Sequence, residues 1–466
     1  MAADSDNSRE KMLATTESVC PECLRRIPAV RVACGDSIYL DKTCPEHGHF
    51  RTRIWQGEPA YHAWARPKPP SQPPVCATKE ERGCPFDCGL CPEHRQHTCC
   101  VLLEVTQRCN LGCPVCFASS RNKGDDPDIS VIEGWYRMLL ASGGPYNIQL
   151  SGGEPTMRDD LPRIIALGRS LGFNFMQLNT NGLRLAEDDT YVKSLKAAGL
   201  DCVFLQFDGT KDAIYEQMRG APLLAKKMTA IRRCAEGGLG VVLTPTLAPG
   251  VNTDNIGAIL QFAIDNMPAV RGVHFQPVSY FGRYPQPPAD GSRLTIPEVI
   301  REIERQTGGR MKAADFHPPG GENAYCSFNG NFVLMPDGQL KSRGQAQGGK
   351  CCSSPVGNGA GAANARDFVA RQWAAASGTG ETACCAGTAG DATKDSFDEF
   401  LERITIYTLA VSGMAFQDAW SLDLERLKEC FIHIVSQDGK LIPFCAYNLT
   451  SSRGQALYRG RGGNDD

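Results

Sequence analysis

The segment 106–120, TQRCNLGCPVCFASS, decides the fold of this chain, because it places three cysteines directly after an apolar stretch. Cys109, Cys113 and Cys116 have C-x3-C-x2-C spacing. A structural zinc ion or an ordinary iron–sulfur cluster takes four ligands, so this triad is one ligand short. Three thiolates can hold three irons of a cubane and leave the fourth iron open to bind another molecule. The alternatives are a zinc knuckle and a four-cysteine cluster completed from elsewhere.

Six short apolar segments follow one another between residues 100 and 290, with amphipathic stretches between them. This α/β pattern predicts a parallel sheet covered by helices. The carboxyl ends of such strands carry the functional site, and the triad follows the first strand. The pattern alone leaves open whether the sheet is doubly wound or a full or partial barrel. The predicted strands are 100–106, 146–152, 174–181, 201–209, 240–246 and 272–278.

Composition limits the class of protein. The chain has 466 residues, enough for about three domains, and a net charge of −3 that gives no reason to expect a nucleic-acid partner. No apolar run reaches the ~18 residues of a membrane span, and no signal-peptide pattern occurs, so a cytoplasmic protein is predicted. The 22 cysteines gather in short groups, which in a reducing compartment indicates metal sites rather than disulfides.

A first metal-binding pattern lies in the predicted N-terminal region, residues 1–65. Its C-x2-C…C-x2-H spacing predicts a zinc-ribbon or rubredoxin-like centre that holds one zinc or iron ion. Cys34 lies between the two pairs and is an alternative to the histidine. The predicted ligands are Cys20, Cys23, Cys44 and His47.

A second C-x3-C-x2-C pattern lies in the next predicted segment, residues 66–99. It precedes the first strand and has no glycine-rich partner of its own, so it predicts an auxiliary [4Fe-4S] cluster, with a zinc site as the alternative. Cys76 is an alternative to the last of its ligands. The predicted ligands are Cys84, Cys88, Cys91 and Cys99.

Residues 291–466 are predicted to form an α+β region with flexible Gly/Ala-rich loops. Helices are predicted at 296–307 and 365–376, followed by a helical run at 397–427. Two apolar stretches flank Asp438-Gly439, which is a hairpin signal.

Several cysteines of this region lie far apart in the sequence. They form a candidate third cluster, or they pack singly as small hydrophobic residues. The candidate ligands are Cys326, Cys430 and Cys445. Two doublets in the glycine-rich tracts, Cys351-Cys352 and Cys384-Cys385, suggest redox or metal-capture chemistry, or one of the first pair completes the third cluster.

A resemblance to a known family emerges from the triad and a second motif. Phe117 follows the triad, and Gly152, Gly153, Glu154 and Pro155 end the second predicted strand. Together these residues resemble the signature of the radical SAM superfamily. The resemblance implies a [4Fe-4S] cluster on the triad, whose open iron binds S-adenosylmethionine (SAM), and a partial (β/α)6 TIM-like barrel over 100–290.

The same resemblance implies roles for polar residues at two further strand ends. Asn179, Asn181 and Asp208 match the positions that line the nucleoside pocket in the superfamily. In that superfamily the reduced cluster cleaves SAM to a 5′-deoxyadenosyl radical, which abstracts hydrogen from an organic substrate. A small reductant such as ferredoxin or flavodoxin would supply the electron.

Longer stretches point to one branch. CPECLRRIPA, CPFDCGLCPEH and DGKLIPFCAYN are similar to the branch of tetraether synthase and class D pterin methylase, and MAFQDAWSLDLERLKEC resembles the radical SAM (seleno)protein TrsS group. The branch implies carbon alkylation or methylation of a small-molecule substrate. The alternatives are lipid carbon–carbon coupling, as in tetraether synthase, and a non-catalytic multi-cluster electron-transfer protein, which leaves the Gly-Gly-Glu-Pro motif unexplained.

Overall fold

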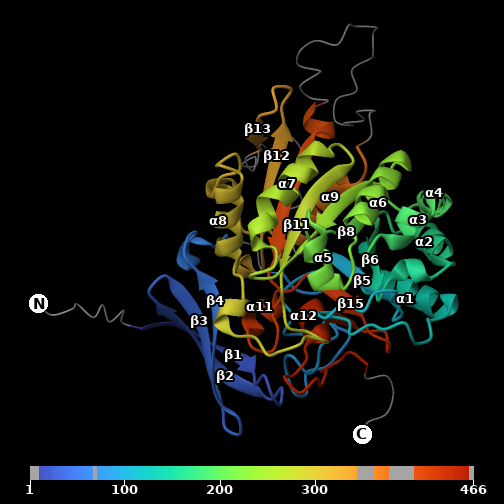
Figure 1. The fold of residues 1–466 in the computed structure, drawn as a ribbon. Coiled ribbons are helices and arrows are strands. Elements are labelled where there is room, and N and C mark those ends of the chain that lie inside the picture. The colour runs from blue at the N-terminus through green and yellow to red at the C-terminus, as the bar shows by residue number, and fades with distance from the viewer. Residues whose placement is uncertain (1–9, 67–70, 344–359, 377–402, 461–466) are drawn as a thin grey trace, which may run out of the picture.

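The computed structural model describes residues 10–66, 71–343, 360–376 and 403–460, and these contain two β-sheets (Figure 1). Both cysteine doublets, and most of the predicted Gly/Ala-rich loops, lie outside the described residues. Within the described residues, no helix is both long enough and apolar enough to cross a membrane.

The smaller sheet is an antiparallel meander at the N-terminus. Its strands are β1 (Lys11–Val19), β2 (Arg26–Cys34), β3 (Ser37–Cys44) and β4 (Gly48–Gln56). The turn between β1 and β2 carries Cys20 and Cys23. The turn between β3 and β4 follows Cys44 and carries His47. Because adjacent antiparallel strands bring alternate turns to the same end of a sheet, the two halves of the predicted metal site meet there.

The larger sheet contains all six predicted strands, which are confirmed as parallel neighbours in chain order. They are β5 (Cys100–Thr106), β6 (Asn147–Gly152), β7 (Met176–Thr180), β8 (Cys202–Gln206), β9 (Gly240–Thr244) and β11 (Val270–Pro277). This is the strand order of a (β/α)6 unit, and no hydrogen bonds join the two outermost described strands, so the sheet is not closed there.

Further strands extend both edges of this sheet. β14 and β15 add in parallel, next to β11 and β5 respectively, whereas β12, β13 and β16 add antiparallel. β10 pairs with β11. These strands are β10 (Thr246–Leu247), β12 (Ser327–Leu334), β13 (Leu340–Ser342), β14 (Thr408–Met414), β15 (Ile432–Val435) and β16 (Leu441–Pro443).

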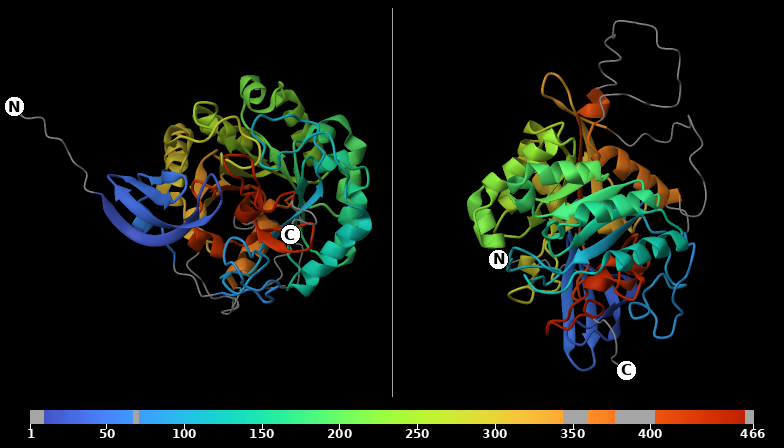
Figure 2. Two further views of the ribbon diagram at one scale, coloured as in Figure 1. Left: turned by 90° about the horizontal axis from the view of Figure 1, so that it is seen from below. Right: turned by 90° about the vertical axis from the view of Figure 1, so that its right-hand side faces the viewer.

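Helices between the parallel strands cover the outer face of the sheet. In the left view of Figure 2 they form an arc around the strands, and the N-terminal sheet lies beside that arc. They are α1 (Ile129–Ala141), α2 (Leu161–Ser170), α3 (Leu183–Glu187), α4 (Asp189–Ala197), α5 (Asp212–Arg219), α6 (Leu224–Glu236), α7 (Ile256–Asp265) and α8 (Ile296–Gln306). The predicted helix at 296–307 is thereby confirmed.

The two faces of the parallel strands differ in chemistry. Successive side chains alternate between the faces. On β5, Val101, Leu103 and Val105 are fully buried in the core under the helices. The inner positions of the neighbouring strands include Gln149 and Gln206, which face a cavity. The sequence therefore places apolar residues toward the helices and polar residues toward the interior.

Helix α9 (Ala360–Trp373) lies across the amino-terminal ends of the strands. The carbonyl of Arg366 accepts a hydrogen bond from Nδ2 of Asn147, the first residue of β6, at 3.1 Å. The carbonyl of Gln372 accepts one from Nε of Arg271, near the start of β11, at 3.2 Å. α9 confirms the helix predicted at 365–376 and covers the end of the sheet opposite the cysteine triad.

The predicted helical run at 397–427 is confirmed at residues 403–406 and near its end, and is wrong between them. Residues 408–414 form β14, between β11 and β12, and only α11 (Leu424–Lys428) is helical near the end of the run. The stretch TLAVSGM is short and buried along most of its length, and such runs have no periodicity that separates strand from helix. The hairpin at Asp438-Gly439 is confirmed as β15–β16.

The remaining C-terminal residues form α12 (Phe444–Asn448) and a segment of turns and bends, residues 449–460, here called the C-terminal strap. The strap contacts the N-terminal sheet where Ser452 N–H donates to the carbonyl of Pro21, at 2.8 Å. It contacts the larger domain where Gly282 N–H donates to Oγ1 of Thr450, at 3.0 Å. It therefore joins the two sheets.

Candidate functional site

One large cavity, about 1580 Å³, fills the interior of the parallel sheet. The thiols of Cys109, Cys113 and Cys116 line it, and so do Gly152 and Gly153 at the end of β6. The structure thus brings the two predicted motifs to the same carboxyl edge of the sheet. Phe117, Glu154, Asn179 and Asn181 line the same cavity.

The loop that carries the triad is held at three points. Nδ2 of Asn181, after β7, donates to Oδ1 of Asn110 at 2.7 Å. Cys109 N–H donates to the carbonyl of Arg121 at 3.0 Å, and Cys116 exchanges backbone hydrogen bonds with Arg283. These contacts fix the thiols relative to the strand ends before any cluster is bound.

The donor set fits a cluster better than a single ion. In the described parts of the chain, only the N-terminal group of four ligand atoms gathers within 4.8 Å, as one tetrahedral ion requires. The three thiols of the triad are spread more widely, as ligands of separate irons are. Burial raises the pKa of the Cys109 thiol to about 11, so binding of iron must displace its proton.

Glycine is required at both positions before Glu154. A Cβ atom on Gly153 would clash with the carbonyl oxygen of Arg108 and lie 2.7 Å from its carbonyl carbon. Gly152 has φ +124°, and a Cβ there would clash with the carbonyl oxygen of Thr106. The end of β6 is therefore in direct contact with the start of the loop that carries the triad, here called the cluster loop.

The Glu154 carboxylate accepts hydrogen bonds from other residues of the protein. One oxygen accepts from the hydroxyls of Thr156 and Thr180, both at 2.6 Å, and the other accepts from Asn181 N–H at 2.7 Å. The side chain is almost fully buried, so these bonds tie the ends of β6 and β7 together. Pro155 starts the turn that follows and is also buried.

Asp208 does not reach the cavity lining, in contrast to Asn179 and Asn181. It is fully buried and forms two hydrogen bonds of 2.7 Å with the guanidinium of Arg219. Arg219 does line the cavity, and its guanidinium also reaches the Cys113 thiol. Asp208 thus positions a cation beside the triad and is itself shielded from the cavity.

We expect Asp208→Asn to destabilise the protein strongly. It leaves the buried Arg219 without its counter-charge, and breaking a buried pair in this way costs about 3–5 kcal/mol. Thermal unfolding followed by circular dichroism measures the effect. Asp189→Asn, which removes an exposed pair with Lys193, should leave the melting temperature unchanged. Equal melting temperatures for both variants would contradict the role assigned to Asp208.

Lys227 on α6 is a buried residue behind the cavity wall that sequence reasoning missed. Its ammonium is fully buried and donates to the carbonyl of Asn181 at 2.5 Å. Burial lowers its pKa to about 8. The signal was available, because Lys227 is in helical phase with Leu223, Ala230 and Cys234, which form the buried face of α6.

The N-terminal turns form a compact four-ligand group. The thiols of Cys20 and Cys44 lie 3.7 Å and 3.4 Å from Nδ1 of His47. A tetrahedral zinc ion would separate such S and N ligands by about 3.6 Å. The fourth member is Cys23, and Cys34 at the end of β2 is not part of the group.

The predicted auxiliary ligands are only partly brought together. Hydrogen bonding to Cys84, followed by burial, raises the pKa of Cys88, and Cys91 adds to that shift, so these three thiols are neighbours. Cys99 instead lines the large cavity and packs near Phe431. The segment after Cys76 lies beside the Cys84–Cys91 segment, because Ala77 N–H donates to the carbonyl of Leu90, at 3.2 Å.

Three cysteines that are distant in sequence converge in the C-terminal region. Burial raises the pKa of Cys430 well above its ordinary value, and the neighbouring Cys445 and Cys326 raise it further. Arg426 donates to the sulfur of Cys326 at 3.5 Å. The sequence named these cysteines, but their proximity depends on β12, β15 and α12 packing together.

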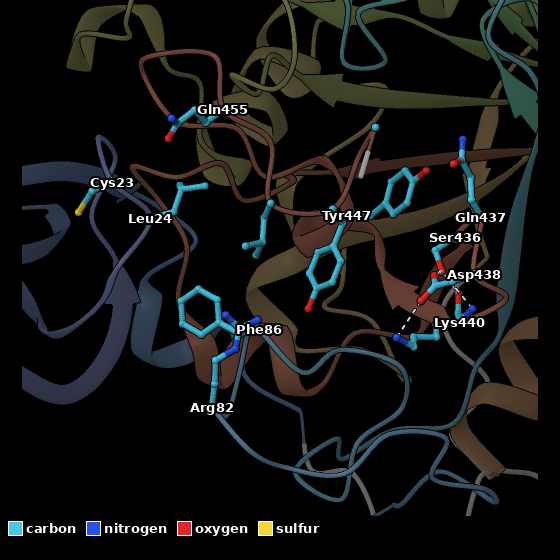
Figure 3. A pocket seen from close by; sticks show the side chains of 13 residues that line it. Cys23, Leu24, Arg82, Phe86, Ser436, Gln437, Asp438, Lys440, Tyr447 and Gln455 are labelled. Atoms are coloured by element: carbon cyan, nitrogen blue, oxygen red, sulfur yellow. Dashed lines mark hydrogen bonds and ion pairs between the residues drawn. The ribbon is translucent and has the colours of Figure 1, made fainter. Parts of the chain in front are cut away.

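A smaller cavity, about 410 Å³, separates the N-terminal metal group from the Cys84–Cys91 segment. Figure 3 shows Arg82 and Phe86 on one side of it and Tyr447 and Lys440 on the other, with Cys23 and Leu24 at its end. The C-terminal strap supplies part of its wall. Tyr458 of the strap donates its hydroxyl to the carbonyl of Pro85, at 2.7 Å, and accepts from Cys88 N–H, at 3.0 Å.

The strap also reaches the cluster loop. Arg459 makes two hydrogen bonds to the buried carboxylate of Glu104 on β5, at 2.9 Å and 2.6 Å. Its guanidinium lies 5.8 Å from the centre of the Phe117 ring. At the other end of the strap, Arg453 contacts Nε2 of His47 at 3.3 Å.

An α/β sheet that presents three thiols and a Gly-Gly-Glu-Pro turn to one cavity defines an iron–sulfur enzyme. The radical SAM superfamily model matches residues 103–263, and the HMPTM N-terminal zinc ribbon domain matches residues 12–56. The chain is 34% identical to the 7,8-dihydro-6-hydroxymethylpterin dimethyltransferase of Methanocaldococcus jannaschii, over 93% of each chain. The chain belongs to the radical SAM superfamily and is an enzyme of that superfamily.

Other proteins are similar over shorter lengths. The Fe-coproporphyrin III synthase of Methanosarcina barkeri is 32% identical over 44% of this chain and 49% of its own. A crystal structure of Streptococcus suis SuiB aligns with 46% of this chain and 47% of its own, at 15% identity and a TM-score of 0.39. The superfamily model and the M. jannaschii relative confirm the predicted superfamily and its relation to a pterin methylase.

Proposed function

We propose that this enzyme uses SAM and a [4Fe-4S] cluster on Cys109, Cys113 and Cys116 to methylate a carbon atom of a pterin-like heterocycle. The observation that carries the proposal is a row of amides and hydroxyls on the inner face of the strands, next to the triad, in a cavity whose lining is otherwise largely apolar. The name of the M. jannaschii relative supplies the substrate class.

The inner faces of seven neighbouring strands present amides and hydroxyls to this cavity. A pterin ring has a hydrogen-bonding edge that such groups match, whereas a lipid chain offers them no hydrogen-bond donor or acceptor. This chemistry favours the heterocycle over lipid coupling. The residues are Gln149, Asn179, Gln206, Thr244, Gln276, Asn329 and Ser412.

His274 is a further candidate for substrate contact. It lines the cavity on β11, and its Nδ1 lies 2.8 Å from Oγ of Ser412. Burial lowers its pKa to about 4, so the ring is neutral near pH 7 and offers one donor and one acceptor. It can therefore orient a polar ring without adding a charge to the cavity.

The chain's residues assemble the site around the cofactor. When bound, the cluster and SAM would supply hydrogen-abstracting radical chemistry. Gly152 and Gly153 let the β6 end approach the cluster loop, and Glu154 locks that end to β7. Arg219 places a positive charge beside Cys113, where it can hold a carboxylate.

Further metal centres belong to the proposal. Cys20, Cys23, Cys44 and His47 would hold one zinc or iron ion, and Cys84, Cys88 and Cys91 an auxiliary [4Fe-4S] cluster. We propose Cys76 rather than Cys99 as the fourth auxiliary ligand, because Cys99 faces the large cavity. A ferredoxin or flavodoxin in the cytoplasm would reduce the clusters.

Incubation of reconstituted, reduced enzyme with SAM and 7,8-dihydro-6-hydroxymethylpterin tests the substrate. We expect 5′-deoxyadenosine together with a pterin that has gained methyl mass, detected by liquid chromatography and mass spectrometry. Parallel reactions contain a reduced-folate methylene donor, or a membrane lipid in place of the pterin. Deoxyadenosine without methylated pterin in any reaction would reject the pterin substrate, and a coupled lipid product would establish the alternative.

We expect Cys44→Ala to lose one metal ion per chain and to melt at a lower temperature. The ion would join the β1–β2 and β3–β4 turns, and a small sheet without it has little core of its own. Metal analysis and thermal unfolding measure both effects. Cys34→Ala is the matched control and should keep the ion. Equal metal content in the two variants would contradict the assignment.

A further inference from the structure

Three side-chain amides on the inner face of β6 and β7 form a chain of hydrogen bonds, here called the amide relay. Nε2 of Gln177 donates to Oδ1 of Asn179 at 3.0 Å. Nδ2 of Asn179 donates in turn to Oε1 of Gln149 at 3.4 Å. Gln149 thus accepts through its oxygen, and among the described residues none accepts from its Nε2. The relay therefore ends in a hydrogen-bond donor that the protein itself does not use.

The wall around this donor is poor in hydrogen-bonding groups. Gln149 pairs in register with Leu102 on β5 and with Gln177 on β7. Leu102 has no polar side-chain atom, and both Gln149 and Leu102 line the large cavity. A ligand that displaces water from Nε2 loses a hydrogen bond unless it brings an acceptor of its own. The position of Gln149 therefore favours a bound molecule with an acceptor at this place.

The depth of Gln149 in the cavity fits the substrate rather than the cofactor. Gln149 precedes Gly152 by three residues on β6, and a strand rises about 3.3 Å per residue, so about 10 Å separates it from the edge that carries the triad. Below it, Asn147 is hydrogen-bonded to the carbonyl of Arg366 in α9, which covers the opposite edge. Gln149 therefore lies between the proposed SAM site and α9.

We propose that Nε2 of Gln149 donates to a ring oxo group of the substrate and so selects 4-oxopteridines over 4-aminopteridines. This deepens the proposed function and rests on its pteridine substrate. A ring carbonyl accepts from Nε2, whereas an amino group at the same ring position sets a donor against a donor. A site built to hydrogen-bond one substrate group rejects an analogue that lacks it. Gln149 determines specificity and takes no part in the radical step.

Isothermal titration calorimetry on the full-length, reconstituted enzyme tests the proposal. SAM is present and reductant is left out, so that no reaction consumes the ligands. The two ligands are 7,8-dihydro-6-hydroxymethylpterin and the 2,4-diamino compound that differs from it only at ring position 4. We expect the 4-oxo compound to bind more tightly by a factor of about ten or more, the size of one well-placed hydrogen bond.

Two variants should reverse this preference. In Gln149→Glu the ionised carboxylate only accepts hydrogen bonds, so it favours the 4-amino compound. In Asn179→Asp the donor to Oε1 of Gln149 is lost, so the Gln149 amide should turn, donate to the new carboxylate and present its oxygen to the cavity. Both ligands are measured on each variant, so a general loss of affinity cancels from the ratio. Gln437→Glu, at an exposed position outside the large cavity, is the matched control and should keep the preference of the unmodified enzyme.

Equal binding of the two compounds by the unmodified enzyme, or an unchanged preference in Gln149→Glu, would overturn the role of Gln149 and leave the pterin substrate in place. The comparison on the unmodified enzyme holds even if a variant fails to fold. An unchanged preference in Asn179→Asp would overturn the relay as the device that orients Gln149. Binding of neither compound would instead overturn the proposed substrate, and this inference with it.

Discussion

Cys113→Ala should abolish formation of 5′-deoxyadenosine from SAM, to the background of the uncatalysed reaction. Cys113 is the most buried thiol of the triad and lies at the end of the large cavity, beside Arg219. Two remaining thiols cannot hold a cubane by three irons, so no open iron is presented to SAM. Liquid chromatography of the reduced reaction measures the product, and iron analysis measures the expected loss of one cluster.

Cys234→Ala is the control for this result. Cys234 is equally a buried thiol, but it packs on α6 in the apolar core under the helices and does not line the cavity. It should retain the clusters and the activity, with only a small loss of stability. Deoxyadenosine formation by Cys113→Ala at the rate of Cys234→Ala would refute the assignment of the triad.

Gly153→Ala should strongly reduce SAM binding, because the β6 end and the loop that carries the triad are in direct contact at this residue. The added methyl would clash with the carbonyl of Arg108, and a backbone atom cannot move aside as a flexible side chain can. The β6 end and the cluster loop must therefore separate. Equilibrium dialysis with SAM measures the affinity of the reconstituted enzyme.

Gly134→Ala separates this steric effect from the general consequence of replacing glycine. Gly134 lies on the exposed side of α1, and a methyl there meets nothing within 4 Å. It should bind SAM normally and gain slightly in helix stability, by about 1 kcal/mol at most. If Gly153→Ala bound SAM as tightly as Gly134→Ala, the close approach would not be required for cofactor binding.

Local patterns predicted most of the fold and the cluster site. The six strands were found because each is a short apolar run bounded by turn residues, and such runs are rarely anything but buried strands in a β–α alternation. The triad and the Gly-Gly-Glu-Pro motif are contiguous in sequence, so their chemistry is visible without knowing the fold. The same holds for the four ligands in the N-terminal turns.

What the sequence did not reveal depends on contacts between distant segments. The pairing of Asp208 with Arg219 gives no local sign, and Asp208 therefore resembled a cavity residue. Cys99 follows the auxiliary cysteines closely in sequence, but β5 begins at the next residue and carries it to the cavity. Residues 408–414 form a strand and not a helix because β11 and β12 pair with them on either side.

The C-terminal strap has a consequence for how the protein is made. It touches three segments that carry metal-binding cysteines, through Arg453, Tyr458 and Arg459, and it lies more than three hundred residues after each of them in the chain. Since a chain folds progressively as it leaves the ribosome, those segments emerge long before the strap does. Any metal that these segments bind can therefore enter while the loops are still accessible, before the strap packs against them.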